Sequence, residues 1–215
     1  MIDLHTHSLF SDGELLPAEL ARRAEVAGYK ALAITDHADS SNLDWVIPRL
    51  IQVCRDLNAH IPMEVIPGIE LTHLPPALIL PMVARARELG ARLVVMHGET
   101  PAEPVAPGTN RQAILAGVDI LAHPGLISEE EVLLAREKGV FLEITSRKGH
   151  SLTNGHVARL AEKLGAALVL NTDTHSPDDL ISPEKALRVV LGAGLSEEQF
   201  RRMRENSAQI ASRVG

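Results

Sequence analysis

The sequence predicts an α/β fold in which a parallel sheet of seven strands closes into a barrel with helices outside it. Short apolar runs alternate with amphipathic segments of helical period along the chain. Runs such as ALAIT, RLVVM and ALVLN consist mainly of Val, Ile, Leu and Ala, which is typical of parallel strands buried on both faces. Seven runs are predicted to be strands: residues 1–4, 31–35, 64–69, 92–96, 119–122, 140–145 and 167–171.

Helices are expected between the strands, in the right-handed crossovers that join parallel neighbours. They cover residues 17–28, 44–58, 76–89, 109–117, 128–138 and 153–164. Glycines lie one to three residues before the next strand, where a helix C-cap is expected, at Gly28, Gly90, Gly117, Gly139 and Gly165. Pro81 lies inside the third helix, and a late start or a kink is expected there because proline removes a helix hydrogen bond.

The tail, residues 183–213, contains two more helical patterns but no candidate metal ligand. Ser196 and Gln199 have the spacing of a capping box, in which each side chain bonds the backbone N–H of the other residue. The chain shows no linker or low-complexity segment, and 45% of its residues are apolar. We therefore expect residues 1–215 to form one domain.

Composition narrows the classes of function. The formal net charge is −7 without a basic run, so nothing supports binding to nucleic acid, and 2% aromatic residues do not suit base stacking. Cys54 is the single cysteine, so metal ligands must be nitrogen and oxygen atoms. No apolar run reaches the roughly 18 residues of a membrane span. We expect a cytoplasmic protein without a membrane partner; the sequence does not indicate an oligomeric state.

Side chains able to bind divalent metals recur at the ends of the predicted strands. They are His5, His7, Asp12, His37, Glu70, His97, His123, Asp173 and His175. The C-terminal ends of all strands of a β/α barrel lie on one face, so these side chains should converge there, whereas an open sheet would spread them along an edge. Imidazole and carboxylate without thiolate suit Zn, Mn or Fe. Nine ligands exceed the needs of one ion and indicate two or three.

Other polar residues have weaker positions. His60 and His156 fall away from the strand ends and are expected on the surface, and His73 follows Glu70 by three residues, near the rim. Asp3 and Asp36 either orient ligating imidazoles or are buried acids satisfied by the backbone. Glu99 and Glu143 lie near strand ends and receive no assignment.

The segment SRKGHSLTNG follows the sixth strand on the same face as the predicted ligands. Arg147, Lys148 and His150 either form a solvated basic loop or meet an anionic group, and arginine suits two-pronged contact with phosphate. A basic loop beside a metal cluster in an acidic protein favours phosphate. We predict that these three residues bind a small phosphorylated substrate.

The motifs DLHTHSLFSDG, ITDHAD, PGIE, LAHPG and NTDTH resemble those of the PHP family, the polymerase and histidinol phosphatase superfamily. The resemblance implies a distorted TIM-like barrel of seven β/α units, here with extra C-terminal helices, and a trinuclear site. One metal would be held by His5, His7, Glu70 and Asp173. A second would be held by Asp12, His37 and His175, and a third by Glu70, His97 and His123, with Glu70 as the bridge.

The predicted function is a metal-dependent phosphoesterase in which metal-activated water attacks a small phosphorylated metabolite, as histidinol phosphate phosphatases do. The catalytic role is assigned to Asp12, His37, Glu70 and His175. Two alternatives stay open. One is a metal-dependent C–N hydrolase, although such barrels commonly use a bridging lysine and no lysine ends a strand here. The other is a non-catalytic or exonuclease-like module acting with partners.

Overall fold

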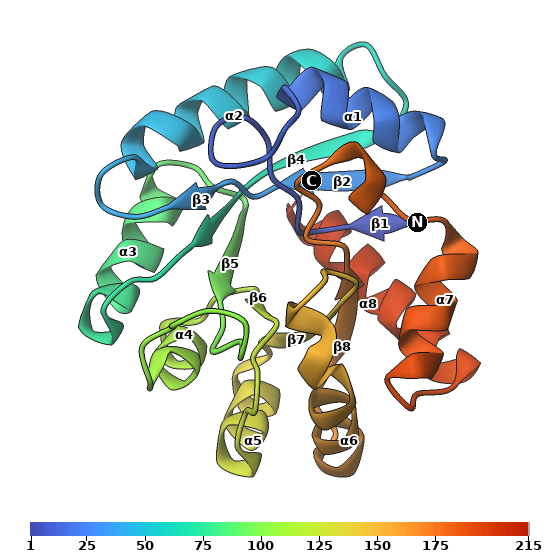
Figure 1. Ribbon diagram of the computed structural model, residues 1–215. Coiled ribbons are helices and arrows are strands. Elements are labelled where there is room, and N and C mark those ends of the chain that lie inside the picture. Colours follow the sequence, from blue (N-terminus) through green and yellow to red (C-terminus); the bar gives the residue numbers. More distant parts are fainter. Residues whose placement is uncertain (215) are drawn as a thin grey trace.

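The computed structural model describes residues 1–214 and has a parallel sheet surrounded by helices (Figure 1). Seven strands follow one another in the order β1-β2-β4-β5-β6-β7-β8, and the short β3 pairs with β4. The strands are β1 (Ile2–Asp3), β2 (Ala31–Ile34), β3 (His37–Ala38), β4 (Glu64–Leu71), β5 (Leu93–His97), β6 (Ile120–Ala122), β7 (Phe141–Thr145) and β8 (Leu168–Asn171). The predicted barrel of β/α units is confirmed.

The second predicted strand is shorter than expected. It ends at Ile34, and the chain re-enters the sheet as β3, where His37 pairs with Glu70. The β4 strand runs two residues past the predicted end, to Leu71, because it has β3 as well as β5 beside its last residues. His37 and Glu70 therefore lie on adjacent strands, in register, rather than in the loops that follow them.

The helices lie outside the sheet, with two 3₁₀ turns in the loops (Figure 1). They are α1 (Pro17–Val26), α2 (Leu43–Asn58), α3 (Pro76–Glu88), α4 (Thr109–Ala116), α5 (Glu129–Lys138), α6 (Asn154–Leu164), α7 (Pro183–Gly192), α8 (Glu197–Val214), η1 (His150–Thr153) and η2 (Pro177–Asp179). The late start expected at Pro81 is wrong, because α3 begins at Pro76, whose fixed φ suits the first helical position. Gly139 and Gly165 end α5 and α6 in the left-handed conformation that favours glycine.

The barrel closes between its first and last strands through the residues just beyond them. Thr6 and Thr174 form a parallel bridge. The N–H of His7 donates to the carbonyl of Thr174 (2.8 Å), and the N–H of Asp173 donates to the carbonyl of His5 (3.0 Å). These bonds join the two histidine-containing motifs nearest the chain ends. Four predicted ligands are thereby fixed side by side, although their motifs are about 165 residues apart.

Helix α8 covers the N-terminal end of the barrel. Its residues Ile210, Ala211 and Val214 pack in the same apolar cluster as the inward-facing side chains of the strands. Asn206 donates to the carbonyl of Leu168, at the start of β8. Its N-terminal cap is the expected capping box: the N–H of Gln199 donates to Ser196 Oγ (3.2 Å), and the N–H of Ser196 donates to Gln199 Oε1 (2.6 Å). The predicted metal ligands lie at the opposite, C-terminal end of the barrel.

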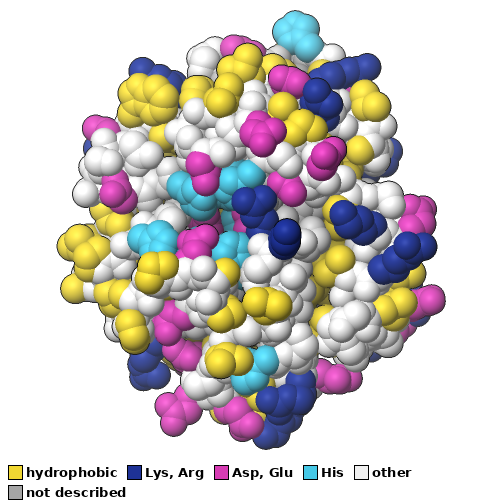
Figure 2. Space-filling model, viewed as in Figure 1, with side chains coloured by type: hydrophobic (Ala, Val, Ile, Leu, Met, Phe, Trp, Pro, Cys, Tyr) yellow, Lys and Arg dark blue, Asp and Glu magenta, His cyan; other side chains and the backbone are white. Residues whose placement is uncertain are grey.

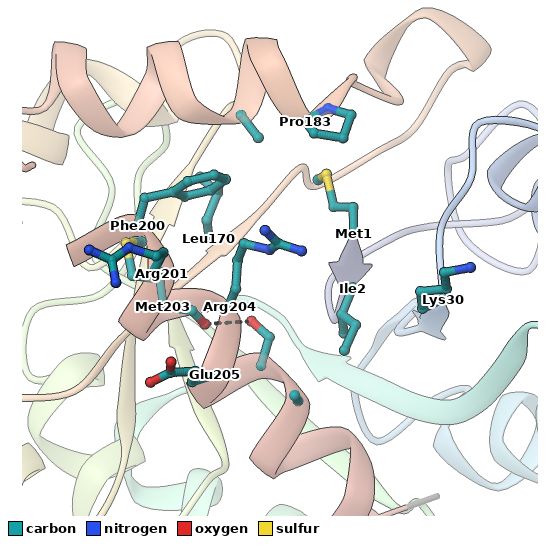
Figure 3. A pocket seen from close by; sticks show the side chains of 13 residues that line it. Met1, Ile2, Lys30, Leu170, Pro183, Phe200, Arg201, Met203, Arg204 and Glu205 are labelled. Atoms are coloured by element: carbon teal, nitrogen blue, oxygen red, sulfur yellow. Dashed lines mark hydrogen bonds between the residues drawn. The ribbon is translucent and has the colours of Figure 1, made fainter. Parts of the chain in front are cut away.

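A cavity of about 360 Å³ lies beside the start of β1, between α7 and α8 (Figure 3). Its lining includes Met1, Leu170, Phe200, Met203 and Arg204, and none of the nine predicted ligands. Within residues 1–214, no helix combines the length and apolar character needed to cross a membrane.

Candidate metal centre

All nine predicted ligands converge at the C-terminal end of the barrel. Figure 2 shows histidine and acidic side chains gathered near the centre of this face, with basic side chains beside them. Six of the nine residues are at most 2% exposed: His5, His7, Glu70, His97, His123 and Asp173. His37 and His175 are partly buried and Asp12 is exposed, so the cluster opens to solvent on their side.

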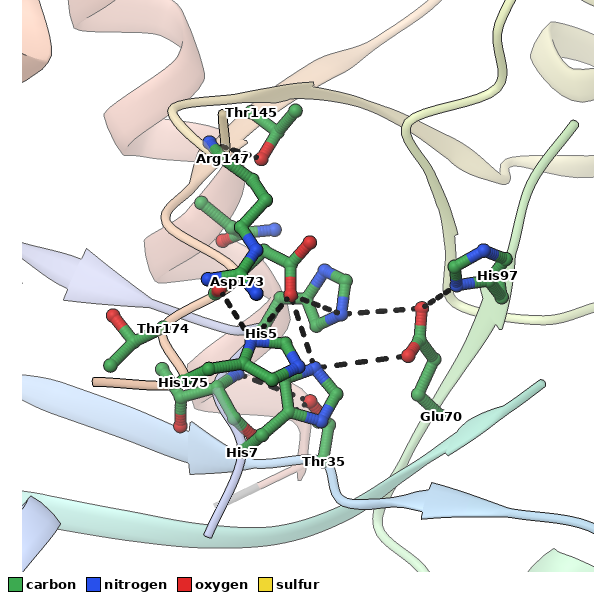
Figure 4. A network of polar contacts seen from close by, with 12 residues as sticks. His5, His7, Thr35, Glu70, His97, Thr145, Arg147, Asp173, Thr174 and His175 are labelled. Carbon is green, nitrogen blue, oxygen red and sulfur yellow. Dashed lines mark hydrogen bonds and ion pairs between the residues drawn. The ribbon is translucent and has the colours of Figure 1, made fainter. Parts of the chain in front are cut away.

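Glu70 lies at the centre of the cluster, and its carboxylate is within 4 Å of five imidazoles. Figure 4 shows it between His97 on one side and the His5 and His7 pair on the other. The distances to its oxygens are 2.6 Å from His37 Nδ1, 3.3 Å from His5 Nε2, 3.4 Å from His97 Nδ1, and 3.8 Å from both His7 Nε2 and His123 Nε2. This position suits a carboxylate that bridges ions.

A second group lies at the open side of the cluster. Asp12 Oδ1 is 3.1 Å from His175 Nε2 and 3.4 Å from His37 Nε2. Donor atoms of these three residues and of His7 lie within 4.8 Å of one another. The structure therefore brings together the set that the resemblance implies for the second metal, with His7 added to it.

The structure divides the remaining residues differently from the implied third set. Donor atoms of His123 group with those of His5 and Asp173, whereas those of His97 group with His37 and Glu70. His123 Nε2 lies 3.6 Å from Asp173 Oδ2, slightly closer than to Glu70. Both rings lie within 4 Å of Glu70, but their other neighbours differ.

Buried polar atoms without hydrogen bonds concentrate at this centre. Among residues 1–214 they are His5 Nε2, both ring nitrogens of His7 and of His97, His123 Nδ1, Glu70 Oε1 and Glu143 Oε1. Leaving a buried polar atom unpaired costs about 1–3 kcal/mol, so such atoms are rare and call for a partner. Nitrogen and oxygen donors converging in this way fit divalent cations, which would bind one nitrogen of each ring and the oxygen of Glu70.

The electrostatics of the centre also fit cations. Burial, with the neighbouring His37 and His97, holds the pKa of His7 and of His123 well below the usual range. Burial acts in the same direction on His97, but Glu70 raises the pKa of His97 to about 10. Burial raises the pKa of Asp173 to about 7. The raised pKa values mean that His97 and Asp173 retain protons that a bound metal ion would displace, whereas the lowered pKa values keep His7 and His123 in the neutral form that binds metal.

Metal affinity should therefore fall as the pH is lowered. At pH 6 both His97 and Asp173 hold protons in the metal-free protein, while at pH 8 Asp173 has lost its proton. Each displaced proton makes affinity change about tenfold per pH unit, so we expect a loss of about ten- to a hundredfold from pH 7 to pH 6. Zinc titrations against a chelator of known pH dependence measure this. An affinity that stays constant from pH 8 to pH 6 would contradict the prediction.

The backbone is strained at the centre. Only three non-glycine residues among 1–214 have positive φ: His73 (51°), His123 (27°) and Asp173 (54°). Such conformations cost on the order of 1–3 kcal/mol and concentrate at functional sites. Two of the three are predicted ligands, and the third follows Glu70 by three residues.

Glu143, which the sequence left unassigned, supports His5. Its Oε2 lies 2.8 Å from His5 Nδ1 and accepts a hydrogen bond from Asn171 Nδ2 (2.9 Å). A carboxylate behind a ligating imidazole holds the ring with its other nitrogen toward the metal. The sequence did contain a signal for such a role, because Glu143 is a charged residue inside the otherwise apolar run FLEIT.

Asp3 and Asp36 are buried acids with other partners. Asp3 accepts hydrogen bonds from the hydroxyl and N–H of Thr172. Asp36 accepts from the N–H and hydroxyl of Ser8 and from the hydroxyl of Ser11. Of the two readings left open for these acids, the structure therefore favours satisfaction by backbone N–H and hydroxyl groups over a hydrogen bond from an imidazole.

The predicted phosphate-binding residues have three different surroundings. Arg147 belongs to the network drawn in Figure 4, and its Nη1 donates to Asp179 Oδ2 (3.0 Å), which also accepts from the N–H of His175 (3.0 Å). His150 is buried and stacks on His123 with ring centroids 4.2 Å apart. Lys148 is exposed. Two of the three residues are thus tied to the cluster, and the binding role of all three stays a prediction.

Of two histidines expected on the surface one is found there, and one further acid contacts a predicted ligand. His60 is exposed, as expected, but His156 is partly buried and its Nε2 donates to the carbonyl of Ile127 (2.7 Å). Glu103, in the loop after β5, lies 3.1 Å from His97 Nε2. Nothing in its sequence position signalled this contact, because the residue belongs to no regular element.

A model of the PHP domain matches residues 3–147, and the match ends before Asp173 and His175. An uncharacterized protein of Methanocaldococcus jannaschii is 50% identical over 200 residues, covering 92% of each chain. A probable phosphatase of Thermoanaerobacter is 28% identical over 230 residues, covering 92% of this chain and 88% of the relative.

Two solved structures share the fold. A chain of an archaeal ribonuclease P complex with mature tRNA superposes with a TM-score of 0.75 at 17% identity, covering 99% of this chain and 90% of its own. Histidinol phosphate phosphatase of Lactococcus lactis, complexed with zinc, L-histidinol and phosphate, gives 0.63 at 18% identity, with coverage of 91% and 94%. At these identities the likeness shows the fold alone.

Proposed function

The chain belongs to the PHP domain family, and on this premise we propose that it is a metal-dependent phosphoesterase acting on a small phosphorylated metabolite. The observation that carries the proposal is the convergence of six imidazoles and three carboxylates, five of which have buried donor atoms without hydrogen-bond partners. No other cluster of this kind lies among the described residues away from this face. Related proteins named as probable phosphatases support the reaction class.

The resemblance implies three ligand sets, two of which share Glu70. His5, His7, Glu70 and Asp173 would hold one ion; Asp12, His37 and His175 would hold a second; Glu70 with His97 and His123, whose rings both lie within 4 Å of its carboxylate, would hold a third. Bound divalent ions lower the pKa of water and offset the charge of phosphoryl oxygens. Two to three ions of Zn, Mn or Fe fit the donor set, and Asp12, His37, Glu70 and His175 keep the assigned catalytic role because they lie at the centre and its open side.

Arg147 would supply a positive charge beside the metal centre that binds the phosphate group of the substrate. The Asp179 carboxylate that it contacts is also bonded to Ser176 and to the N–H of His175, so the guanidinium is anchored to the same loop as a predicted ligand. Its side chain stays 29% exposed, which leaves N–H groups free for an anion. A planar guanidinium can bond two phosphoryl oxygens at once.

The two alternatives predict different behaviour. A C–N hydrolase with a bridging lysine lacks its bridge here, because a glutamate occupies the centre and Lys148 is exposed. A module that acts through partners has the support of the ribonuclease P chain, whose fold is shared. The net charge of −7 and the complete ligand set favour catalysis over that role.

A substrate screen tests the proposal. Protein loaded with Mn²⁺ or Zn²⁺ should release phosphate from p-nitrophenyl phosphate and more rapidly from one member of a panel of phosphorylated metabolites that includes histidinol phosphate. Hydrolysis of amide substrates is measured in parallel to test the C–N hydrolase alternative. Binding of mature tRNA is measured to test the alternative of a module that acts with partners. Absence of metal-dependent phosphate release across the panel, with ions bound, would refute the phosphoesterase assignment.

A further inference from the structure

The imidazole of His97 has two nitrogens that face in opposite directions. Nδ1 lies 3.4 Å from Glu70, at the centre of the cluster, while Nε2 lies 3.1 Å from Glu103 Oε2, on the outer side. The residue is 2% exposed, and neither ring nitrogen makes a hydrogen bond. An unpaired buried nitrogen is therefore directed at a carboxylate outside the nine-residue set.

His73 completes a group on this outer side. Its Nε2 lies 3.1 Å from the same Glu103 oxygen, and its ring centroid is 5.0 Å from that of His97. Donor atoms of His73, His97 and Glu103 all lie within 4.8 Å of one another. The side chains of His73 and Glu103 are 42% and 39% exposed, so the group is open to solvent. His73 has a positive φ, as His123 and Asp173 do at the inner cluster.

We propose that His73, His97 and Glu103 form an outer position for a divalent metal ion, which shares only His97 with the nine predicted ligands and adds His73 and Glu103 to it. Two imidazoles and one carboxylate are a common donor set for zinc when a site keeps an open position. Three protein ligands leave room for water or for an oxygen of a bound anion. The proposal goes beyond the phosphoesterase assignment, since the ion binds whether or not the inner centre is catalytic.

The outer ion and a third inner ion compete for His97. A neutral imidazole binds one ion through one nitrogen and carries a proton on the other. When Nε2 binds the outer ion, the Nδ1–H is left to donate to Glu70; when Nδ1 binds an inner ion, the Nε2–H is left to donate to Glu103. The outer position should therefore hold the most weakly bound ion of the protein, and the total should not exceed three.

A simpler role for Glu103 is to orient His97 through a hydrogen bond, as outer carboxylates do for ligating histidines. That role does not involve His73, whose loss would then leave metal binding unchanged. The two accounts thus differ in the behaviour of one exposed histidine.

Cobalt titration distinguishes them. The protein as isolated is dialysed against metal-free buffer so that it keeps its tightly held ions, and Co²⁺ is added while its visible absorption is followed. The variants are His73→Ala and Glu103→Gln, with His60→Ala and Glu137→Gln as matched controls on exposed surface away from the cluster. Elemental analysis of each dialysed sample reports the tightly held ions separately.

Wild type and both controls should bind one further Co²⁺ ion with the same affinity. In His73→Ala and in Glu103→Gln the affinity for this ion should fall by about tenfold or more. The number of tightly held ions should be the same in all samples. Equal Co²⁺ affinity in wild type and His73→Ala would overturn the outer site, including the case in which Glu103→Gln alone weakens binding. Failure of phosphate release in the substrate screen leaves this result unaffected, so the two proposals fail separately.

Discussion

Glu70→Gln should lower metal-dependent phosphoesterase activity by on the order of a thousandfold and reduce the metal content of the protein. The carboxylate lies within 4 Å of five imidazoles, so its loss affects every neighbouring ion position at once. Metal ions contribute several kcal/mol to a phosphoryl-transfer transition state, and each 1.36 kcal/mol is a factor of ten in rate. Phosphate release and elemental analysis of the same sample measure both effects.

Glu64→Gln is the matched control, because Glu64 lies at the other end of the same strand, β4, and is partly exposed. It should keep wild-type metal content and activity. Equal metal content and activity in Glu70→Gln and wild type would remove Glu70 from the site. Both variants should fold as wild type does, because an amide is close in size to the carboxylate it replaces. Circular dichroism checks this.

Arg147→Ala should raise KM for phosphomonoesters and lower kcat/KM by roughly ten- to a hundredfold, with metal content unchanged. The guanidinium is anchored by Asp179 beside His175, where it can hold a phosphoryl group. Loss of a charge-assisted hydrogen bond costs about 1.5–3 kcal/mol, which corresponds to that range. Steady-state kinetics on the best substrate of the screen test this.

Arg188→Ala, on the exposed face of α7, is the control and should behave as wild type. Lys148→Ala should show a smaller loss than Arg147→Ala, because Lys148 is exposed and has no hydrogen bond or ion pair with another side chain among residues 1–214. If Arg147→Ala and Lys148→Ala both retain wild-type kcat/KM, the phosphate-binding role of residues 146–150 is wrong, even if the metal centre stands.

The strands and the convergence of the nine residues could be predicted because each depends on local pattern. A continuous apolar run identifies a buried parallel strand, and a β/α barrel gathers the residues that follow such runs on one face. The break between β2 and β3 could not be predicted, because it depends on pairing with β4, a segment about 30 residues later. The late helix start predicted from Pro81 was wrong, because α3 already begins at Pro76 and continues through Pro81.

Side-chain partners were harder to predict than positions. Glu143 lies in a buried strand and signals a polar partner, yet only the fold shows that the partner is His5, 138 residues away. Glu103 lies in a loop whose path has no sequence pattern, so its contact with His97 could not be predicted. Which nitrogen of an imidazole faces which neighbour is likewise set by packing around the ring.

The central claim is that the nine residues hold a cluster of metal ions, and elemental analysis of protein expressed in metal-replete medium tests it most directly. The expected result is two to three equivalents of Zn, Mn or Fe per chain, retained through gel filtration. One equivalent or fewer per chain would contradict the multinuclear centre.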